Sequence, residues 1–260
     1  DSWQSVGALD YVHLFVFPDG EMLASDLGFH IQRSTDGGQT WNTVHTAGSH
    51  IGGFAYNPVN GDVYAWQDYP AAGENGRVWR SSDKGLIWTL LLDAPELDIH
   101  QIAVSPGGGI FIGAGAEIRR SLDNGNTWDT LDPHVAGSTD PVDVAVSASG
   151  RLFAYDFFQS FFSDDNGDTW LPLEDASGNA FRAFGSTTNG TVFARRPPSG
   201  SLYRSEDNGA TWSFSAVGIP FPTVLEWVFL EETRFLARTN DGLFYSGNDG
   251  ADWMLAWNDV

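Results

Sequence analysis

Nine side chains of types that bind or transform ligands occur at the ends of predicted strands. They are His13, Trp66, His100, Asp143, Tyr155, Arg182, Arg195, Glu226 and Arg238. The guanidinium groups of Arg182, Arg195 and Arg238 are forked donors that suit a carboxylate or a sulfate. The rings of Trp66 and Tyr155 suit stacking on the face of a sugar. Together these residues predict a ligand-binding site, and ion pairs between neighbouring repeats are the alternative use of the same charges.

The acidic members of this set also allow catalysis. Paired carboxylates such as Asp143 and Glu226 would serve glycoside hydrolysis or a lyase reaction if the fold made them face each other. The catalytic residues of such an enzyme would be Asp143, Tyr155 and Glu226. No ligand spacing in the sequence marks a metal site, although His13, His50 and His100 are the residues that could form one. We therefore expect no metal and no cofactor.

The elements that must position these residues come from a repeat. The stretch RSTDGGQTW at 33–41 returns as near-copies at 80–88, 120–128, 162–170, 204–212 and 245–253. The serines of successive copies are 47, 40, 42, 42 and 41 residues apart. Short polar residues and a glycine favour a tight turn, because the Asp carboxylate accepts backbone N–H bonds and glycine adopts a positive φ without steric cost. Each copy, called here the corner motif, predicts a turn between two strands that its tryptophan packs down.

Each repeat contains four short strands. A segment such as GRLFAY, 150–155, precedes every corner motif, and an alternating segment such as VDVAVS, 142–147, comes before that. Four strands recurring about every 40–45 residues indicate a β-propeller blade. We predict an all-β, six-bladed β-propeller of four-stranded antiparallel blades, a single domain over 1–260, with a corner motif in each turn between the third and fourth strands. The predicted blades are 8–45, 46–91, 92–131, 132–173, 174–215 and 216–257, and residues 2–6 form an extra edge or ring-closing strand.

Strand parity assigns the candidate residues to one face. In an antiparallel four-strand meander, the connection before the first strand and the turn between the second and third emerge opposite the corner motifs. The nine candidates lie at those ends, and so do five of the six histidines, at 13, 45, 50, 100 and 134. Two loops that often carry specificity, 67–77 and the proline-stiffened 195–200, lie there too. We expect function on this corner-free face.

The corner motif S-x-D-x-G-x-T-W resembles the Asp-box, or bacterial neuraminidase repeat, of sialidases, sortilin-like receptors, photosystem assembly factors and several glycoside hydrolases. The resemblance covers essentially the whole chain. It implies a propeller in which the boxes are structural corners away from the functional face. It does not choose among catalysts, lectins and scaffolds, because this fold hosts all three.

A sialidase of this family would have an arginine triad drawn from several blades, an early Arg-Ile-Pro motif, an Asp acid/base and a Tyr–Glu nucleophile pair. No Arg-Ile-Pro occurs in the chain, and its first arginine, Arg33, lies beside a corner motif. The arginines expected on the corner-free face, Arg182, Arg195 and Arg238, gather in the last two blades. This departure argues against a sialidase.

Composition excludes several classes of partner. The chain has 13 basic and 34 acidic residues and a net charge of −21, which repels phosphate backbones and anionic membranes. We therefore expect neither nucleic acid nor membrane insertion. Cysteine is absent, which removes thiolate catalysis and Cys-ligated metals. We expect a monomer that is secreted, periplasmic or on the cell surface.

Two functions remain. The favoured one is a non-catalytic extracytoplasmic binding module that holds a glycan or protein segment on the corner-free face. The alternative is a sialidase-like glycoside hydrolase or polysaccharide lyase. Repeats averaging about 42 residues favour the module, because enzymes of this fold carry longer loops that build a deep cleft.

Overall fold

The computed structural model describes residues 11–67, 75–95, 97–133, 141–175, 177–215, 217–219, 224–231 and 234–257. Three predicted features lie outside these residues: the strand at 2–6, most of the loop at 67–77, and His134. The chain divides into two compact units, 1–132 and 133–260, called here the N-terminal and the C-terminal unit. The prediction of a single domain over 1–260 stays a prediction.

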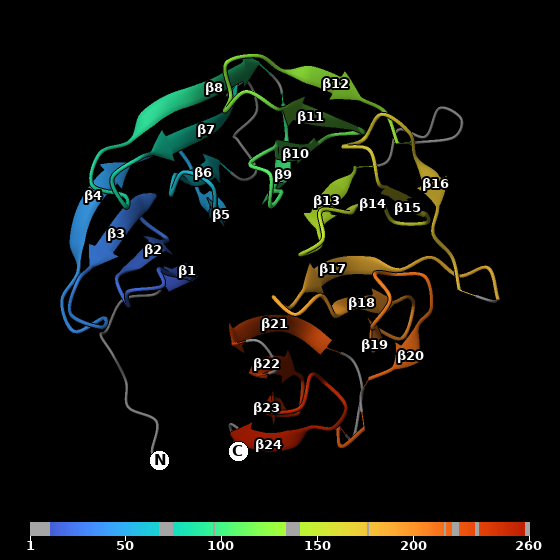
Figure 1. Ribbon diagram of the computed structural model, residues 1–260. Helices are drawn as coiled ribbons and strands as arrows, with labels where there is room; N and C mark the ends of the chain where they lie inside the picture. Colours follow the sequence, from blue (N-terminus) through green and yellow to red (C-terminus); the bar gives the residue numbers. More distant parts are fainter. Residues whose placement is uncertain are drawn as a thin grey trace. The chain divides into compact units, whose positions relative to one another are not determined.

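The N-terminal unit contains three four-stranded antiparallel sheets, or blades (Figure 1). Blade 1 consists of β1 (Tyr11–Val16), β2 (Met22–Asp26), β3 (His30–Ser34) and β4 (Asn42–Thr46). Blade 2 consists of β5 (Ile51–Tyr56), β6 (Val63–Gln67), β7 (Asn75–Ser81) and β8 (Thr89–Pro95). Blade 3 consists of β9 (Ile99–Val104), β10 (Ile110–Ala114), β11 (Glu117–Ser121) and β12 (Asp129–Leu131).

The C-terminal unit contains three more blades of the same kind. Blade 4 consists of β13 (Asp143–Val146), β14 (Leu152–Tyr155), β15 (Ser160–Ser163) and β16 (Leu171–Pro172). Blade 5 consists of β17 (Arg182–Ser186), β18 (Val192–Arg196), β19 (Ser201–Ser205) and β20 (Ser213–Phe214). Blade 6 consists of β21 (Val224–Glu231), β22 (Arg234–Thr239), β23 (Gly242–Ser246) and β24 (Met254–Trp257). These sheets confirm the predicted fold class, an all-β propeller with six blades of four antiparallel strands.

Blade 2 is longer than the sequence predicts. The predicted loop at 67–77 includes Asn75–Arg77, but these residues belong to β7, where Asn75 pairs with Pro95 and Arg77 with Asp93. β8 therefore continues four residues past the predicted blade end at 91. Part of the extra length of this repeat therefore belongs to the β7–β8 hairpin.

The corner motif links the third strand of each blade to the fourth, and its hydrogen bonds explain its composition. In the first copy, Ser34 Oγ accepts the Gly38 N–H (2.9 Å) and donates to Asp36 Oδ1 (2.8 Å). Asp36 Oδ1 in turn accepts the Thr40 N–H (2.9 Å), and Trp41 Nε1 donates to the Gly38 carbonyl (2.9 Å). The bond from the glycine N–H to the serine Oγ recurs in all six copies. The repeated residues therefore make a self-contained turn.

The pKa values of the carboxylates in three corner motifs predict that the folded protein loses stability in acid. Hydrogen bonds lower the pKa of Asp36, Asp165 and Asp207 from 3.8 to about 2, and the bond from the threonine hydroxyl has the largest effect in each case. Because the folded pKa lies below the unfolded one, this stabilisation is complete above about pH 4 and is lost as the pH falls towards 2. The triple Asp→Asn variant should show a flatter fall of unfolding free energy between pH 4 and pH 2 in urea titrations. Equal slopes for the variant and the wild type would contradict this account.

Asparagine is a suitable replacement because the sixth corner motif already contains one. There, Asn248 Oδ1 accepts a hydrogen bond from Ser246 Oγ (3.1 Å) and another from the Asp252 N–H (3.2 Å). The turn therefore keeps its geometry without a carboxylate, so the triple variant changes the titration and leaves the fold in place.

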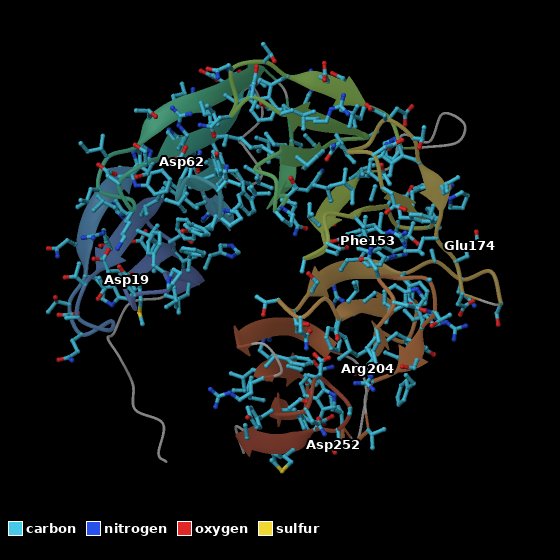
Figure 2. All side chains as sticks on the ribbon, viewed as in Figure 1. Asp19, Asp62, Phe153, Glu174, Arg204 and Asp252 are labelled. Atoms are coloured by element: carbon cyan, nitrogen blue, oxygen red, sulfur yellow. The ribbon has the colours of Figure 1, made fainter. Side chains whose placement is uncertain are left out.

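Arginines tie neighbouring blades together within each unit. Arg33 Nε donates to the Lys84 carbonyl (3.1 Å), and Arg80 Nη1 donates to the Asn124 carbonyl (3.2 Å). Arg204, labelled in Figure 2, donates through Nη1 to the Asp249 carbonyl (2.9 Å). Each donor directly precedes a corner-motif serine, and each acceptor lies in the corner motif of the next blade. We call this contact the arginine latch.

Blade 4 makes its latch from a different strand. Phe162 occupies the position before Ser163 that an arginine holds in the other latches. Arg151, which directly precedes the neighbouring β14, lies with its guanidinium 4.3 Å from the centre of the Phe162 ring. Its Nη1 donates to the Asn208 carbonyl (2.8 Å). The latch is therefore preserved although its donor has moved.

Candidate functional site

Three cross-strand pairs of the C-terminal unit contain most of the predicted site residues. Each pair joins the start of a blade's first strand to the end of its second strand. The pairs are Asp143 with Tyr155, Arg182 with Arg195, and Glu226 with Arg238. The sequence-based assignment of these residues to equivalent strand ends is therefore confirmed by the strand register.

A pocket of about 320 Å³ lies beside the middle pair. Its lining residues are Phe157, Arg182, Arg195, Pro197, Pro198 and Gly200. Phe157 belongs to the turn between β14 and β15, and 197–200 form the turn between β18 and β19. Both turns join the second strand of a blade to its third, so the pocket opens on the face opposite the corner motifs. A concave site of this size with two convergent cations is a candidate ligand site.

Arg182 is the central cation of this pocket. Its guanidinium lies 4.1 Å from the centre of the Phe157 ring, within the range of a cation–π contact. Burial lowers the pKa of Arg182, the Asp156 carboxylate opposes that shift, and the charge of Arg195 adds to it. Within the described residues, the buried Nε of Arg182 has no hydrogen-bond acceptor. A partly desolvated cation with an unsatisfied donor favours an anion beside it.

The neighbouring arginine, Arg196, has a structural role. Its Nη2 lies 2.9 Å from Asp175 Oδ2, and its Nη1 donates to Tyr203 Oη (3.1 Å). Asp175 also accepts backbone N–H groups of Ser177 and Asn179, which shapes the connection into blade 5. Arg196 therefore braces the rim of the pocket, while Arg182 and Arg195 line it.

Two aromatic residues mark the rim. Phe157 and Phe158 are 65% and 69% exposed, and their rings are 5.3 Å apart in an edge-to-face arrangement. Asp156 Oδ1 accepts the N–H groups of Phe158 and Gln159 (both 2.6 Å), which fixes the turn that presents the two rings. Sequence reasoning missed these residues. The sequence could have revealed their exposure, because a short turn cannot bury two successive phenylalanines.

The two aromatic residues predicted to stack on a sugar lie elsewhere. Trp66 is 6% exposed and packs over Gly53, where an added Cβ would lie 2.6 Å from the indole Cη2. Tyr155 is 7% exposed, and its ring centre is 5.3 Å from that of Phe184. Burial raises the pKa of the Tyr155 hydroxyl, and the Asp143 carboxylate adds to the shift. Both rings are mostly buried, which argues against stacking on a sugar face, and a catalytic role of Tyr155 stays a prediction.

The candidate histidines of the N-terminal unit make separate contacts. The His13 N–H donates to Ser25 Oγ (3.2 Å), and His100 Nε2 lies 3.9 Å from Asp98 Oδ2. His45 lies within β4 instead of in a connection, where burial lowers its pKa. Among the residues that the structure describes, no three His, Asp or Glu side chains are grouped to hold a metal. The described ranges also contain no helix with the length and apolarity that a membrane crossing requires.

Comparison with known proteins places the chain among two kinds of relative. No protein-family profile matches it. A xyloglucanase of Hypocrea jecorina (strain QM6a) is 26% identical over 188 residues, which are 69% of this chain and 22% of that enzyme. The chain thus spans about a fifth of the length of this curated relative.

Solved structures of other proteins superpose on nearly the whole chain. An ancestral GH74 enzyme superposes with a TM-score of 0.73 at 15% identity, covering 99% of this chain and 40% of the enzyme. A structure of Ycf48 bound to D1 peptide superposes with a TM-score of 0.68 at 18% identity, covering 91% of this chain and 78% of Ycf48. At these identities the likeness shows a shared fold. One of these structures is of an enzyme and the other holds a peptide, so the shared fold does not decide between catalysis and binding.

Proposed function

We propose that this chain is an Asp-box β-propeller that acts as a non-catalytic, extracytoplasmic binding module, whose corner-free face holds a carboxylate-bearing segment of a glycan or protein. The observation that carries the proposal is the pocket beside Arg182 and Arg195. Guanidinium groups recognise carboxylates through paired, charge-assisted hydrogen bonds. The bound peptide in Ycf48 supports a binding role for this fold.

The electrostatics of the pocket support an anionic ligand despite the overall charge of −21. Many carboxylates of the C-terminal unit are paired with other groups: Asp164 with Arg151, Asp175 with Arg196, and Glu206 with Arg204. Burial and the charge of Arg195 both disfavour the charged form of Arg182, the Asp156 carboxylate opposes them, and a ligand carboxylate beside Arg182 would add to that opposition. A local positive site on an acidic surface also discriminates against polyanions, because the surrounding field repels them.

A binding array tests this proposal. The panel contains peptides and oligosaccharides, each kind with and without carboxylate groups. We expect the wild type to retain only carboxylate-bearing members, and Arg182→Gln to weaken that binding about tenfold or more, because a charged hydrogen bond is lost. Arg77→Gln is the matched control, since Arg77 pairs with Asp93 in the N-terminal unit and should bind like the wild type. Equal retention of neutral members, or unchanged binding by Arg182→Gln, would refute the proposal.

The second candidate function is glycoside hydrolysis, which the 26% identity to a xyloglucanase favours. Asp143 and Glu226 lie on the first strands of blades 4 and 6 and remain the proposed catalytic carboxylates. A reducing-sugar assay on xyloglucan and on acidic polysaccharides decides the matter. Turnover that Glu226→Gln abolishes would establish the enzyme, whereas binding without turnover would establish the module.

A further inference from the structure

We propose that the pocket recognises the end of a polypeptide: an apolar C-terminal residue whose own α-carboxylate meets Arg182 and Arg195. This inference rests on the proposed function and names its ligand class. It follows from what lines the pocket, from how near its charged and apolar groups lie, and from its size.

The lining offers cations and apolar surface but no acceptor side chain. Besides the two arginines it consists of a phenylalanine, two prolines and a glycine. A uronic acid would bring hydroxyl groups as well as a carboxylate, and a buried hydroxyl without a hydrogen-bond partner is costly. The pocket therefore suits a ligand that is apolar apart from its carboxylate.

The charged and apolar parts of the site nearly touch. The Arg182 guanidinium lies 4.1 Å from the centre of the Phe157 ring. A ligand must then carry its anionic group and its apolar group within a few bonds of each other. A C-terminal residue does so, because its side chain and its α-carboxylate share one Cα atom. An internal Asp or Glu has the carboxylate but carries no apolar group beside it.

The size and surroundings of the pocket favour the end of a polypeptide over an internal segment. A volume of about 320 Å³ is near the lower limit for ligand pockets and suits a single residue. Phe158 lies next to Phe157 and is 69% exposed, so it can cover the residue that precedes the terminus. Exposed aromatic pairs of this kind supply contact area at low cost in conformational entropy.

Fluorescence anisotropy with labelled peptides tests the inference on the full chain. The reference probe is a tetrapeptide that ends in Leu-Phe with a free carboxylate. We expect its C-terminal amide to bind about tenfold more weakly or worse, because the charge is lost. A peptide acid that ends in Ser should bind several-fold more weakly. Competition with 3-phenylpropanoate should require far higher concentrations than competition with the unlabelled peptide.

Two matched variants connect the result to the site. Phe158→Ser should reduce the preference for Leu-Phe over Gly-Ser ends several-fold. Phe214→Ser removes a 47% exposed phenylalanine of β20 that does not line the pocket, and it should leave the preference unchanged. Circular dichroism on both variants checks that they are folded, so a loss of preference reports on the pocket.

The outcomes separate this inference from the proposed function. Equal affinity for the acid and the amide, or equal potency of 3-phenylpropanoate and the peptide, overturns the chain-end ligand. Equal, Arg182-dependent binding of glucuronate or of an internal Glu peptide also overturns it, and leaves the proposed carboxylate module intact. If no carboxylate probe binds, both proposals fail.

Discussion

Replacing Phe153 with alanine is expected to lower the free energy of unfolding by about 3–5 kcal/mol. Phe153 is 1% exposed and stacks on Phe184 of blade 5, with ring centres 4.5 Å apart and planes 6° from parallel. A Cβ built at Gly209, in the corner motif of blade 5, would lie 3.2 Å from the Phe153 ring. The truncation therefore opens a cavity between two blades that are both held in place by their own strands. Urea denaturation followed by tryptophan fluorescence measures the loss.

The matched control is Phe214→Ala in the same unit. Phe214 is 47% exposed and touches one ring, that of Tyr203, at 5.9 Å. Its loss should cost about 1 kcal/mol or less, because little apolar surface leaves the interior. Comparable losses for the two variants would show that blades 4 and 5 are not joined through the Phe153 stack.

Gly218→Ala is expected to be strongly destabilising. Its φ is +96°, and an added Cβ would lie 2.2 Å from the Trp253 carbonyl oxygen. That carbonyl cannot move freely, since the Trp253 N–H donates to the Val217 carbonyl (2.9 Å) and its indole donates to the Ser215 carbonyl (2.6 Å). Backbone strain of about 1–2 kcal/mol and a steric clash of about 1–3 kcal/mol should add. The same urea titration gives the sum.

Gly190→Ala separates the two contributions. Gly190 has a φ of +97°, almost that of Gly218, but among the described residues no atom beyond its two chain neighbours lies within 4 Å of the position of its added Cβ. It should therefore show the backbone strain alone. If Gly218→Ala is no more destabilising than Gly190→Ala, the close approach to Trp253 has no energetic consequence.

The corners and strands were predictable because local chemistry determines them. The Ser, Asp and Gly of the corner motif satisfy one another within five residues, as the bonds among Ser34, Asp36 and Gly38 show. The segment VDVAVS became strand β13, whose successive residues Val144 and Ala145 are both buried, so this strand packs on both faces. Strand parity then placed Arg182 and Arg195 correctly opposite each other. These predictions depend only on residues that are close together in the sequence.

The predictions about side-chain exposure failed where a glycine on the next strand decided the outcome. Trp66 was expected at a sugar-binding surface, yet Gly53, its register partner on β5, leaves room for the indole to lie flat in the core. A tryptophan opposite a glycine is thus a signal for burial that sequence reasoning could use. Sequence analysis predicted the cations of the pocket but not its aromatic rim, because the rim comes from blade 4 and the cations come from blade 5. Contacts between blades depend on tertiary packing, which no periodicity reveals.

The arginine latch affects how the number of blades in such a chain can increase. Its acceptor is always a main-chain carbonyl, offered in turn by Lys84, Asn124, Asn208 and Asp249, so side-chain drift at that position leaves the bond intact. Its donor need not be the residue before the corner-motif serine, as Arg151 shows. Blades 2 and 5 each supply both a donor and an acceptor, so a duplicate of either blade can join its neighbours through the same bonds. Duplication of such a blade can lengthen an array of this kind without new complementary mutations at the seam.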